Sequence, residues 1–363
     1  MMKDKKLVIL TAGGTGGHIY PAEALATELE HRGFNVMLFT DARGLNNYKG
    51  KLGEIENRAI CSGSVIGKSV LTKIISLFKV GLGVLQAGFY LFRGKPCCVV
   101  GFGGYASFPT AVAAIILRIP LIVHEQNSVM SRTNRILAPF ASVVAQSFRK
   151  VKNTPKGSKS VLTGMPVRET IALLHEQPRK KSSDKKTLVI LGGSQGARVF
   201  AEVVPAAVKL LDGKLQEKLT LYQQCRKGEE AQVEQAYEGL PCKTIVRSFF
   251  ENMPELYSQA DFMISRSGAS SVYEIAAAGV PAMFVPLPIA ADNHQYYNAE
   301  EFVEAGAACL VLQKDFTPEK VKHVLEDLFS NSEHFAVMSE KAKDMALVDA
   351  SAQLADVVQH FVC

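Results

Sequence analysis

Several features are missing from the 363-residue sequence, and each absence narrows its class. It has no tryptophan and no Cys-X-X-Cys pair, which excludes a zinc ribbon and a thioredoxin-type motif. Its seven cysteines are odd in number and scattered, as expected for reduced thiols in a cytoplasmic protein. The sequence also lacks a Gly-X-Y period, a long heptad run and a tandem repeat, so collagen, coiled-coil and solenoid folds are excluded. The remaining composition, 47% apolar and 21% charged, is that of a globular protein, and the length predicts two domains.

Acidic residues are almost absent from one long stretch of the chain. Between residues 57 and 168 the sole carboxylate is Glu125, against 15 Lys and Arg. A stretch with this charge is attracted to anionic surfaces. RNA-binding repeats and aromatic RNP patterns are missing, so nucleic acid is not an expected partner. The anionic leaflet of a membrane is the favoured surface.

The same stretch contains the longest apolar run of the sequence. Residues 69–92 are mostly apolar, but Lys73 and Lys79 interrupt them, which makes the run a poor membrane span. Two lysines in an apolar helix fit a helix that lies at the membrane interface, with its ammonium groups reaching the headgroups. Residues 68–95 are therefore predicted to bind an anionic membrane surface; the alternative is an ordinary core helix.

Apolar strands lead into glycine loops at three places. Residues 6–10 precede the loop at 13–17, residues 187–191 precede the loop at 192–196, and residues 98–100 precede the loop at 101–104. The first run, too short for a signal peptide, is predicted to be a strand. Strands and helices alternate throughout, which predicts an α/β protein of two facing, doubly wound, Rossmann-like domains with a cleft between them.

The glycine loops suit phosphate groups, because backbone N–H groups and a helix dipole converge there. The dinucleotide fingerprint fails at residues 14–19 and at 193–196, and nearly succeeds at 101–106, with Glu125 placed like a ribose-binding acid. An NAD-type oxidoreductase therefore stays an alternative. No Asp-X-Asp occurs, so a metal-chelated diphosphate is not indicated, and Arg168 and Arg198 are candidate charge partners. Glu274 is a candidate for a ribose diol, and His18 and the His124–Glu125 pair are candidates for proton transfer.

Seven segments together resemble the MurG-type peptidoglycan N-acetylglucosaminyltransferases of the GT-B fold. They lie in the order of that family and span residues 13–299: Gly13-Gly14-Thr15-Gly16-Gly17-His18, Gly103-Gly104-Tyr105, His124-Glu125-Gln126-Asn127, Pro166-Val167-Arg168, Gly192 to Arg198, Arg266-Ser267-Gly268-Ala269 with Glu274, and His294-Gln295 with Asn298-Ala299. Each is weak alone, and seven in register are specific. Met165 and Ala201 depart from the pattern of the family, each standing where an Asn is usual.

The resemblance implies an inverting transfer of GlcNAc from UDP-GlcNAc to the muramoyl 4-hydroxyl of lipid I, which forms lipid II for peptidoglycan, cell shape and division. It implies a peripheral enzyme on the cytoplasmic face of the inner membrane, with no cofactor and no metal, and with cell-wall or divisome proteins as partners. It also implies an acceptor and membrane domain at residues 1–167, to which a helix at 345–363 returns, and a UDP-GlcNAc-binding domain at 168–344. A GT-B enzyme with another lipid-linked acceptor, or a catalytically silent scaffold, are the alternatives.

The resemblance also implies roles for single residues. His18 and Glu125 are the two candidates for the catalytic base, and Tyr105 and His124 would face the acceptor. The residues that would bind UDP-GlcNAc are Thr15, Gly16, Gly17, Asn127, Arg168, Ser194, Phe250, Ala269, Ser270, Ser271, Val272, Tyr273, Glu274 and Gln295. Within this group Arg168 and Ser194 would meet the diphosphate, Phe250 the uracil, Glu274 the ribose and Gln295 the sugar.

Overall fold

The computed structural model describes residues 6–13, 16–47, 51–63, 70–179, 184–193 and 196–361. The chain forms two compact units. The first holds Met1–Arg168 together with Val348–Cys363, and the second holds Glu169–Leu347. Each unit is built on one parallel sheet, which confirms the predicted pair of Rossmann-like α/β domains.

The first unit has a parallel sheet of order β3-β2-β1-β4-β5-β6-β7 in its described residues. The strands are β1 (Leu7–Thr11), β2 (Asn35–Thr40), β3 (Glu56–Ala59), β4 (Cys98–Gly101), β5 (Leu121–Glu125), β6 (Val143–Gln146) and β7 (Ser160–Leu162). The central strands are buried on both faces and rich in Val, Ile and Leu, as parallel strands must be. Because all run the same way, their carboxyl ends lie along one edge, and the glycine loops follow β1 and β4 at this edge.

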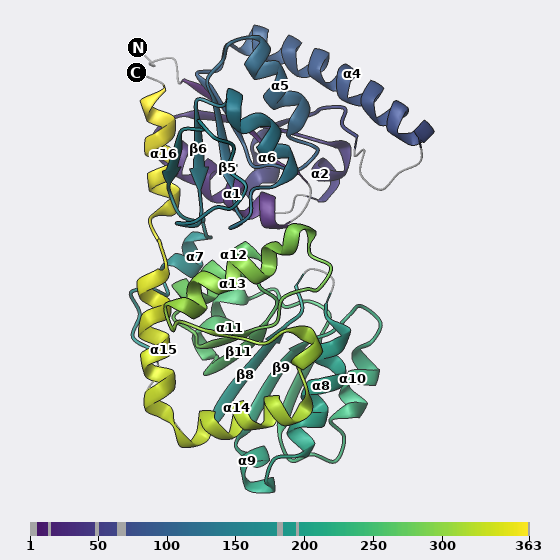
Figure 1. Cartoon of the computed structure of the whole chain (residues 1–363), viewed down its shortest axis with the longest axis vertical. Helices are drawn as coiled ribbons and strands as arrows, with labels where there is room; N and C mark the ends of the chain where they lie inside the picture. Colours follow the sequence, from purple (N-terminus) through teal and green to yellow (C-terminus); the bar gives the residue numbers. More distant parts are fainter. Residues whose placement is uncertain are drawn as a thin grey trace. The chain divides into compact units, whose positions relative to one another are not determined.

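Helices cover both faces of this first sheet. They are α1 (Gly16–His31), α2 (Ala42–Asn47), α3 (Lys51–Glu54), α4 (Val70–Gly94), α5 (Phe108–Ile116), α6 (Arg132–Leu137) and α16 (Ala350–His360). Helix α16 packs on α1, where Leu354 and Val358 join Leu25 and Leu29 in one buried cluster (Figure 1). Helices α4 and α5 lie side by side on the other face, over a second cluster.

Helix α4 has two contrasting sides. Ala87 and Leu91 are fully buried in the cluster below the helix. Large apolar side chains on the remaining surface are exposed, including Leu77 at 68%, Phe78 at 75% and Leu85 at 72%. The segment Thr72–Gly94 is long and apolar enough to cross a membrane by length and composition, and 22% of it is buried. The part of the predicted interfacial stretch at residues 68–69 lies outside the described residues.

The second unit has a parallel sheet of order β10-β9-β8-β11-β12-β13 in its described residues. The strands are β8 (Lys186–Leu191), β9 (Leu219–Gln224), β10 (Lys243–Arg247), β11 (Phe262–Ser265), β12 (Ala282–Phe284) and β13 (Cys309–Leu310). The helices are α7 (Glu169–Ala172), α8 (Arg198–Lys209), α9 (Gly213–Glu217), α10 (Glu230–Ala236), α11 (Met253–Gln259), α12 (Ala269–Ala277), α13 (His294–Glu304), α14 (Pro318–Ser330) and α15 (Ser332–Met345).

The segment before α13 has an unusual backbone. Asp292 and Asn293 end the short 3₁₀ helix η2 (Ala291–Asn293), and their φ angles are positive, 52° and 54°. Helix α13 begins directly afterwards, so His294 and Gln295 lie on its first turn. The two left-handed residues turn the chain sharply enough to start the helix there, a conformation that Asn and Asp tolerate best among residues with a side chain.

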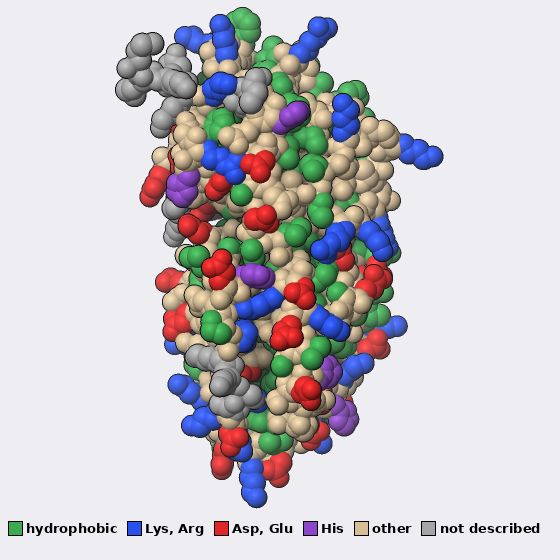
Figure 2. All heavy atoms as spheres, turned by 90° about the vertical axis from the view of Figure 1, so that its left-hand side faces the viewer, with side chains coloured by type: hydrophobic (Ala, Val, Ile, Leu, Met, Phe, Trp, Pro, Cys, Tyr) green, Lys and Arg blue, Asp and Glu red, His purple; other side chains and the backbone are tan. Residues whose placement is uncertain are grey.

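Exposed apolar side chains are not uniformly distributed over the molecule. The face shown in Figure 2 carries Lys and Arg side chains intermixed with Asp and Glu, with green apolar atoms in small scattered groups. Small scattered groups are normal for a soluble surface. The row of large exposed apolar side chains along α4 is therefore a distinct feature of the first unit.

Candidate active site at the strand ends

His18 lies in the first turn of α1, directly after the loop that follows β1. The backbone of the neighbouring loop comes very close to it. A Cβ on Gly104 would lie 3.5 Å from both Cδ2 and Nε2 of the imidazole, and one on Gly13 would lie 3.7 Å from Cδ2. Gly103 and Gly104 have φ angles of 78° and 77°, which residues with side chains rarely adopt. The positive φ angles therefore require glycine at residues 103 and 104, in the loop that lies against the imidazole ring.

The electrostatic setting of His18 keeps its ring neutral. Burial is the largest effect and lowers the pKa of His18, while the Gln126 side chain and the Phe102 carbonyl act in the opposite direction. A neutral imidazole near physiological pH has one nitrogen with a free lone pair. His18 is therefore chemically suited to accept a proton.

Glu125, the other predicted base, is held by hydrogen bonds on both oxygens. Its Oε1 accepts from the Asn127 backbone N–H at 3.0 Å, and its Oε2 accepts from the Ser131 N–H and from Asn134 Nδ2, each at 2.8 Å. The side chain has no exposed surface. Burial raises the pKa of Glu125, and these hydrogen bonds oppose that rise. The arrangement makes Glu125 the anchor of the loop between β5 and α6, and also leaves no oxygen for a ribose diol, which removes the main support for an NAD-type reading.

His124 is fully buried beneath the same loop. Its Nδ1 accepts a hydrogen bond from Gln126 Nε2 at 3.1 Å, and its Nε2 lies 3.4 Å from the Gly164 carbonyl. Burial lowers the pKa of His124 to about 4. The ring is thus neutral and enclosed, and it offers no surface to an acceptor in this structure.

Tyr105, the other residue predicted to face the acceptor, is partly exposed at the start of α5. Its hydroxyl donates to Asp41 Oδ2 at 3.1 Å and also accepts a hydrogen bond from Arg43, whose guanidinium stacks on the ring at 5.5 Å. Burial and the neighbouring Asp41 raise the pKa of Tyr105. The phenol therefore stays protonated and is oriented by two charged neighbours that the sequence had not indicated.

Four further predicted residues lie around the same edge of the first unit. Gly16 and Gly17 form the start of α1, and Asn127 is partly exposed after β5. Arg168 belongs to this unit rather than to the second, and its guanidinium lies 4.9 Å from the centre of the Tyr20 ring. Thr15 and Ser194 lie outside the described residues.

In the second unit, β11 leads into α12 through the turn Arg266-Ser267-Gly268. Arg266 is buried and donates to the carbonyls of Val285 and Pro286 and to Gln313 Oε1. Burial lowers the pKa of Arg266 to about 10, and its guanidinium stacks on Phe200 at 5.0 Å. The hydroxyls of Ser267 and Ser270 are buried and have no hydrogen-bond partner among the described residues. Together with the free N–H groups of α12, this turn is suited to an anion.

The predicted nucleotide turn, residues 269–274, divides into a surface part and a core part. Val272 and Tyr273 are core residues, with Tyr273 packed edge-on against Phe302 at 5.4 Å, so their side chains do not face a ligand. Glu274 is 6% exposed, and its Oε2 accepts from the Tyr257 hydroxyl at 2.9 Å. This hydrogen bond orients the carboxylate, whose oxygens can accept hydrogen bonds from the two hydroxyls of a diol.

The glycine loop after β8 is enforced by its surroundings. A Cβ on Gly192 would lie 2.2 Å from the Ala197 nitrogen, and Gly196, with φ of 68°, would clash with the Cys225 carbonyl at 2.9 Å. No other residue fits either position without displacing backbone. Gln295 accepts from the Leu287 N–H at 2.9 Å, and the Phe250 ring packs edge-on against Tyr222 at 6.1 Å. Among the described residues, no cluster of three or more His, Cys, Asp or Glu could hold a metal ion.

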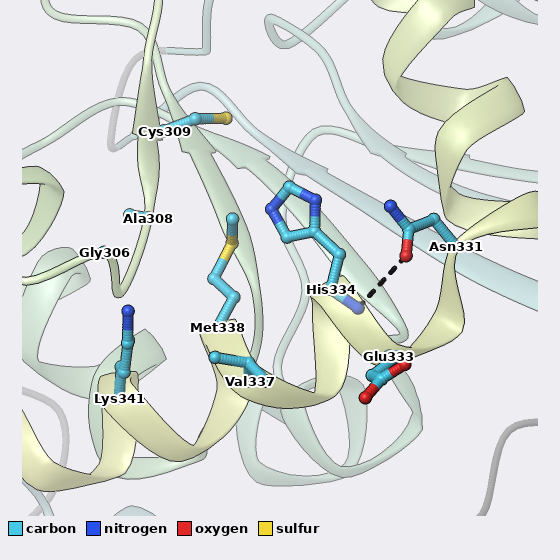
Figure 3. Close-up of a pocket in the computed structure, with 9 residues that line it drawn as sticks. All are labelled: Gly306, Ala308, Cys309, Asn331, Glu333, His334, Val337, Met338 and Lys341. Atoms are coloured by element: carbon cyan, nitrogen blue, oxygen red, sulfur yellow. Dashed lines mark hydrogen bonds between the residues drawn. The ribbon is translucent and has the colours of Figure 1, made fainter.

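A separate cavity of about 580 Å³ lies in the second unit, beside the edge strand β13 and helix α15 (Figure 3). Its lining includes Cys309, His334 and Lys341, and none of the residues predicted for the site. Burial raises the pKa of the Cys309 thiol to about 11, so the thiol is protonated and unreactive near neutral pH. The cavity therefore does not compete with the strand-end loops as the reaction site.

Comparison with known proteins identifies relatives that match both units. The glycosyltransferase family 28 N-terminal domain matches residues 8–146, and the C-terminal domain of that family matches residues 187–354. The chain is 41% identical over 362 residues to a protein of Paramagnetospirillum magneticum named UDP-N-acetylglucosamine--N-acetylmuramyl-(pentapeptide) pyrophosphoryl-undecaprenol N-acetylglucosamine transferase, covering 99% of this chain and 97% of that protein.

The chain belongs to glycosyltransferase family 28. A Rhodospirillum rubrum protein of the same name is 42% identical over 355 residues, covering 97% of this chain and 91% of that protein. The crystal structure of Acinetobacter baumannii MurG is similar with a TM-score of 0.78 and 33% identity, covering 98% of this chain and 99% of that one. The predicted MurG-type resemblance and the predicted glycosyltransferase class are confirmed.

A more distant structure shows the fold alone. The UDP-GlcNAc 2-epimerase of Neisseria meningitidis, solved with UDP-GlcNAc, is 14% identical with a TM-score of 0.69, covering 98% of this chain and 100% of that one.

Site residues that the sequence had not indicated are mostly polar partners of the predicted ones. Asn134 and Ser131 hold Glu125, Asp41 and Arg43 hold Tyr105, and Tyr257 holds Glu274. Asn134 carried one usable signal, since it lies three residues after the Ser131 N-cap of α6. Ser131 lies six residues after Glu125, whereas Asp41, Arg43 and Tyr257 come from other segments that no local pattern links to their partners.

Proposed function

We propose that this protein transfers GlcNAc from UDP-GlcNAc to the muramoyl 4-hydroxyl of lipid I, forming lipid II and UDP for peptidoglycan synthesis. The observation that carries this proposal is the identity of about 40%, over nearly the whole chain, to relatives named for this transfer. The glycine loops, His18 and Glu274 lie where two parallel sheets present their carboxyl ends, the usual place for ligands in such sheets.

The donor is assigned mainly to the second unit. Glu274, oriented by Tyr257, is placed on the ribose hydroxyls, and the start of α12 with Ser270 and Ser271 is placed on the diphosphate side. Ser194, Phe250 and Gln295 keep their predicted roles toward diphosphate, uracil and sugar. For Val272 and Tyr273 the contact is assigned to backbone, because their side chains belong to the core. Thr15, Gly16, Gly17, Asn127 and Arg168 are the donor contacts assigned to the first unit.

His18 is the better of the two base candidates. Its ring is neutral, one face rests on glycine backbone, and it is partly exposed. Glu125 has both oxygens occupied by protein donors and no exposed surface. In a single displacement one base takes the proton of the acceptor hydroxyl while the diphosphate leaves, stabilised by N–H groups and arginine. We assign the first task to His18 and assign to Glu125 the positioning of its loop.

The first unit is assigned to the acceptor and the membrane, and the second to the nucleotide sugar. The predicted boundaries, 1–167 with 345–363 and 168–344, differ from those of the two units by one residue at Arg168 and by three residues before Val348. The exposed apolar row on α4, with Lys73, Lys79 and Arg93 around it, is placed on an anionic membrane surface. Because α4 also packs on the core through Ala87 and Leu91, we assign it to the interface rather than to a span. The expected setting is peripheral, on the cytoplasmic face of the inner membrane, with cell-wall or divisome proteins nearby.

Release of UDP from UDP-GlcNAc with a lipid I analogue tests the proposal. Acceptor-dependent release that His18→Gln abolishes and His31→Gln preserves is the expected result, since His31 lies exposed at the other end of α1. Donor binding without turnover on that acceptor would transfer the assignment to another lipid-linked sugar. Failure to bind UDP-GlcNAc at all would contradict the proposal.

A further inference from the structure

Two polar atoms beside the proposed base are buried and unpaired. His18 Nδ1 and Gln126 Oε1 each have no hydrogen-bond partner among the described residues. Gln126 is 2% exposed, so water cannot serve its oxygen from bulk solvent. Buried polar atoms in folded proteins are almost always paired, so each of these two atoms calls for an explanation.

The amide of Gln126 is held in one orientation by its nitrogen. Nε2 donates to the Phe102 carbonyl at 2.9 Å and to His124 Nδ1 at 3.1 Å. Flipping the amide would set its oxygen against the carbonyl oxygen of Phe102, which is an acceptor in every state. The fixed nitrogen therefore also fixes the direction of Oε1, on the opposite corner of the planar group.

His124 reinforces this orientation. Because its Nδ1 accepts from Gln126, its proton is on Nε2, facing the Gly164 carbonyl at 3.4 Å. The pKa of His124, lowered to about 4 by burial, keeps the ring in this neutral form at working pH. His124 thus works as a rigid acceptor at the back of Gln126.

We propose that Gln126 is a positioning residue, whose Oε1 accepts the Nδ1 proton of His18 and thereby leaves Nε2 of His18 as the nitrogen that takes the proton of the acceptor sugar. This inference deepens the proposed function and rests on the base role of His18. The Gln126 side chain and the Phe102 carbonyl both raise the pKa of His18 against the effect of burial, so both groups lie beside the imidazole.

The step balances with these groups alone. The hydroxyl proton of the acceptor moves to His18 Nε2, and its oxygen forms the new bond to the anomeric carbon. The bond from that carbon to the diphosphate breaks, and the electron pair leaves with UDP. The imidazolium so formed keeps its Nδ1–H on Gln126 Oε1, which stabilises the positive charge at the moment it appears.

The tautomer of His18 is a direct test that needs no activity. The ¹⁵N shifts of the His18 ring in the full chain, assigned by their loss in His18→Gln, distinguish a protonated from a bare nitrogen. We expect a protonated Nδ1 and a bare Nε2 in the wild-type protein. A protonated Nε2 with a bare Nδ1 would overturn the positioning role, even with His18 essential for turnover.

Kinetics supply the second test. We expect Gln126→Met to lower kcat by about 10- to 100-fold, which is less than the roughly 10²- to 10⁴-fold that a general base contributes as a whole. The KM for UDP-GlcNAc should change less than threefold. The acid limb of the kcat profile should move to lower pH, because the imidazolium loses its partner.

A matched control is Gln146→Met, at the end of the adjacent strand β6, whose side chain bonds Thr154 and Ser160 instead. It should leave kcat and the pH profile unchanged. An unshifted acid limb in Gln126→Met, or equal losses in both variants, would contradict the proposal. Retained turnover in His18→Gln would overturn the base role and this inference with it, whatever the tautomer.

Discussion

The two units share one architecture, yet the carboxyl edges of their sheets carry different chemistry. In the first unit this edge holds His18, His124 and Glu125, three titratable groups whose pKa values burial displaces. In the second unit this edge holds the hydroxyls of Ser267 and Ser270, the amide of Gln295, and Arg266. The guanidinium of Arg266 stays charged although burial lowers its pKa to about 10. Displaced pKa values mark places where protons are handled, whereas helix termini and fixed charges mark places where anions are bound. This difference is what we expect if, as proposed, the first unit transfers the proton and the second binds the nucleotide.

The carboxylates sharpen this contrast. Glu125 accepts hydrogen bonds from Asn127, Ser131 and Asn134, which all lie within nine residues of it. Glu274 accepts from the hydroxyl of Tyr257 on the preceding helix α11, at 2.9 Å. The same residue type therefore holds a loop in one unit and links two helices in the other, and the position of the donors along the chain separates these roles.

The largest expected effect comes from replacing His18 in the first unit. His18→Gln should lower kcat by about 10²- to 10⁴-fold, because it removes the base, while the affinity for UDP-GlcNAc changes little. Steady-state UDP release and calorimetric donor binding measure the two quantities separately. A loss of donor affinity as large as the loss of kcat would contradict the assignment of the base to the first unit and of donor binding mainly to the second.

Glu274→Gln should show the opposite pattern. Losing the charge on the ribose acceptor should weaken donor binding by roughly 10- to 100-fold, as expected for hydrogen bonds to a charged group, with kcat at saturating donor nearly unchanged. Calorimetry with UDP-GlcNAc measures this effect. Glu234→Gln, exposed on α10, is the matched control and should bind normally.

The third prediction concerns stability and pH. The folded-state pKa of His124 is about 4, below the ordinary value of 6.5, so the unfolded chain binds the extra proton as pH falls. This group's contribution is therefore complete above pH 6.5 and is lost toward pH 4; between pH 7 and 5 the loss is about 2 kcal/mol.

Urea unfolding of wild type and His124→Asn at pH 7 and pH 5 measures it. The variant should lose about 2 kcal/mol less than the wild type over this interval. Equal losses would show that His124 is not kept neutral by burial.

The smallest expected effect is on membrane binding. Leu77→Ser, at an exposed position of α4, should weaken binding to anionic vesicles by roughly fivefold, about 1 kcal/mol, because one side chain enters the interface only in part. Co-sedimentation with vesicles measures it. Leu210→Ser, equally apolar and 47% exposed on the second unit, should bind like the wild type. A similar loss of vesicle binding in both variants would contradict the proposal that the first unit binds the membrane.

The sequence predicted the strands and glycine loops because their signals are local. Runs of Val, Ile and Leu followed by glycine identify a buried parallel strand and its turn, and Gly104 and Gly196 are at the positions where backbone allows nothing else. Glu274 was predicted from the turn before it. These features depend on neighbours within a few residues.

The burial of His124 and the saturation of Glu125 could not be predicted in the same way. They depend on how the loop after β5 folds back, which brings Ser131 and Asn134 onto Glu125. The contact of Arg266 with the carbonyl of Val285 likewise depends on two strands being neighbours in the sheet. Pairing of polar groups from different segments leaves no periodic pattern in a sequence. A histidine at the end of a strand, such as His124, therefore gives the same sequence signal whether its side chain is buried or exposed.

The return of α16 to the first unit has a consequence for synthesis in the cell. Leu354, Ala355 and Val358 belong to the same buried cluster as Val8 and Leu10 of the first strand. Arg32, directly after α1, donates hydrogen bonds to Gln359 Oε1 and to the Ala352 carbonyl. About 180 residues, Glu169–Leu347, are translated between the two parts of this cluster. At typical ribosomal speeds the apolar surface of α1 waits roughly 10–40 s for its cover. During translation the second unit can finish folding before the first, so the part made earliest is the one completed last.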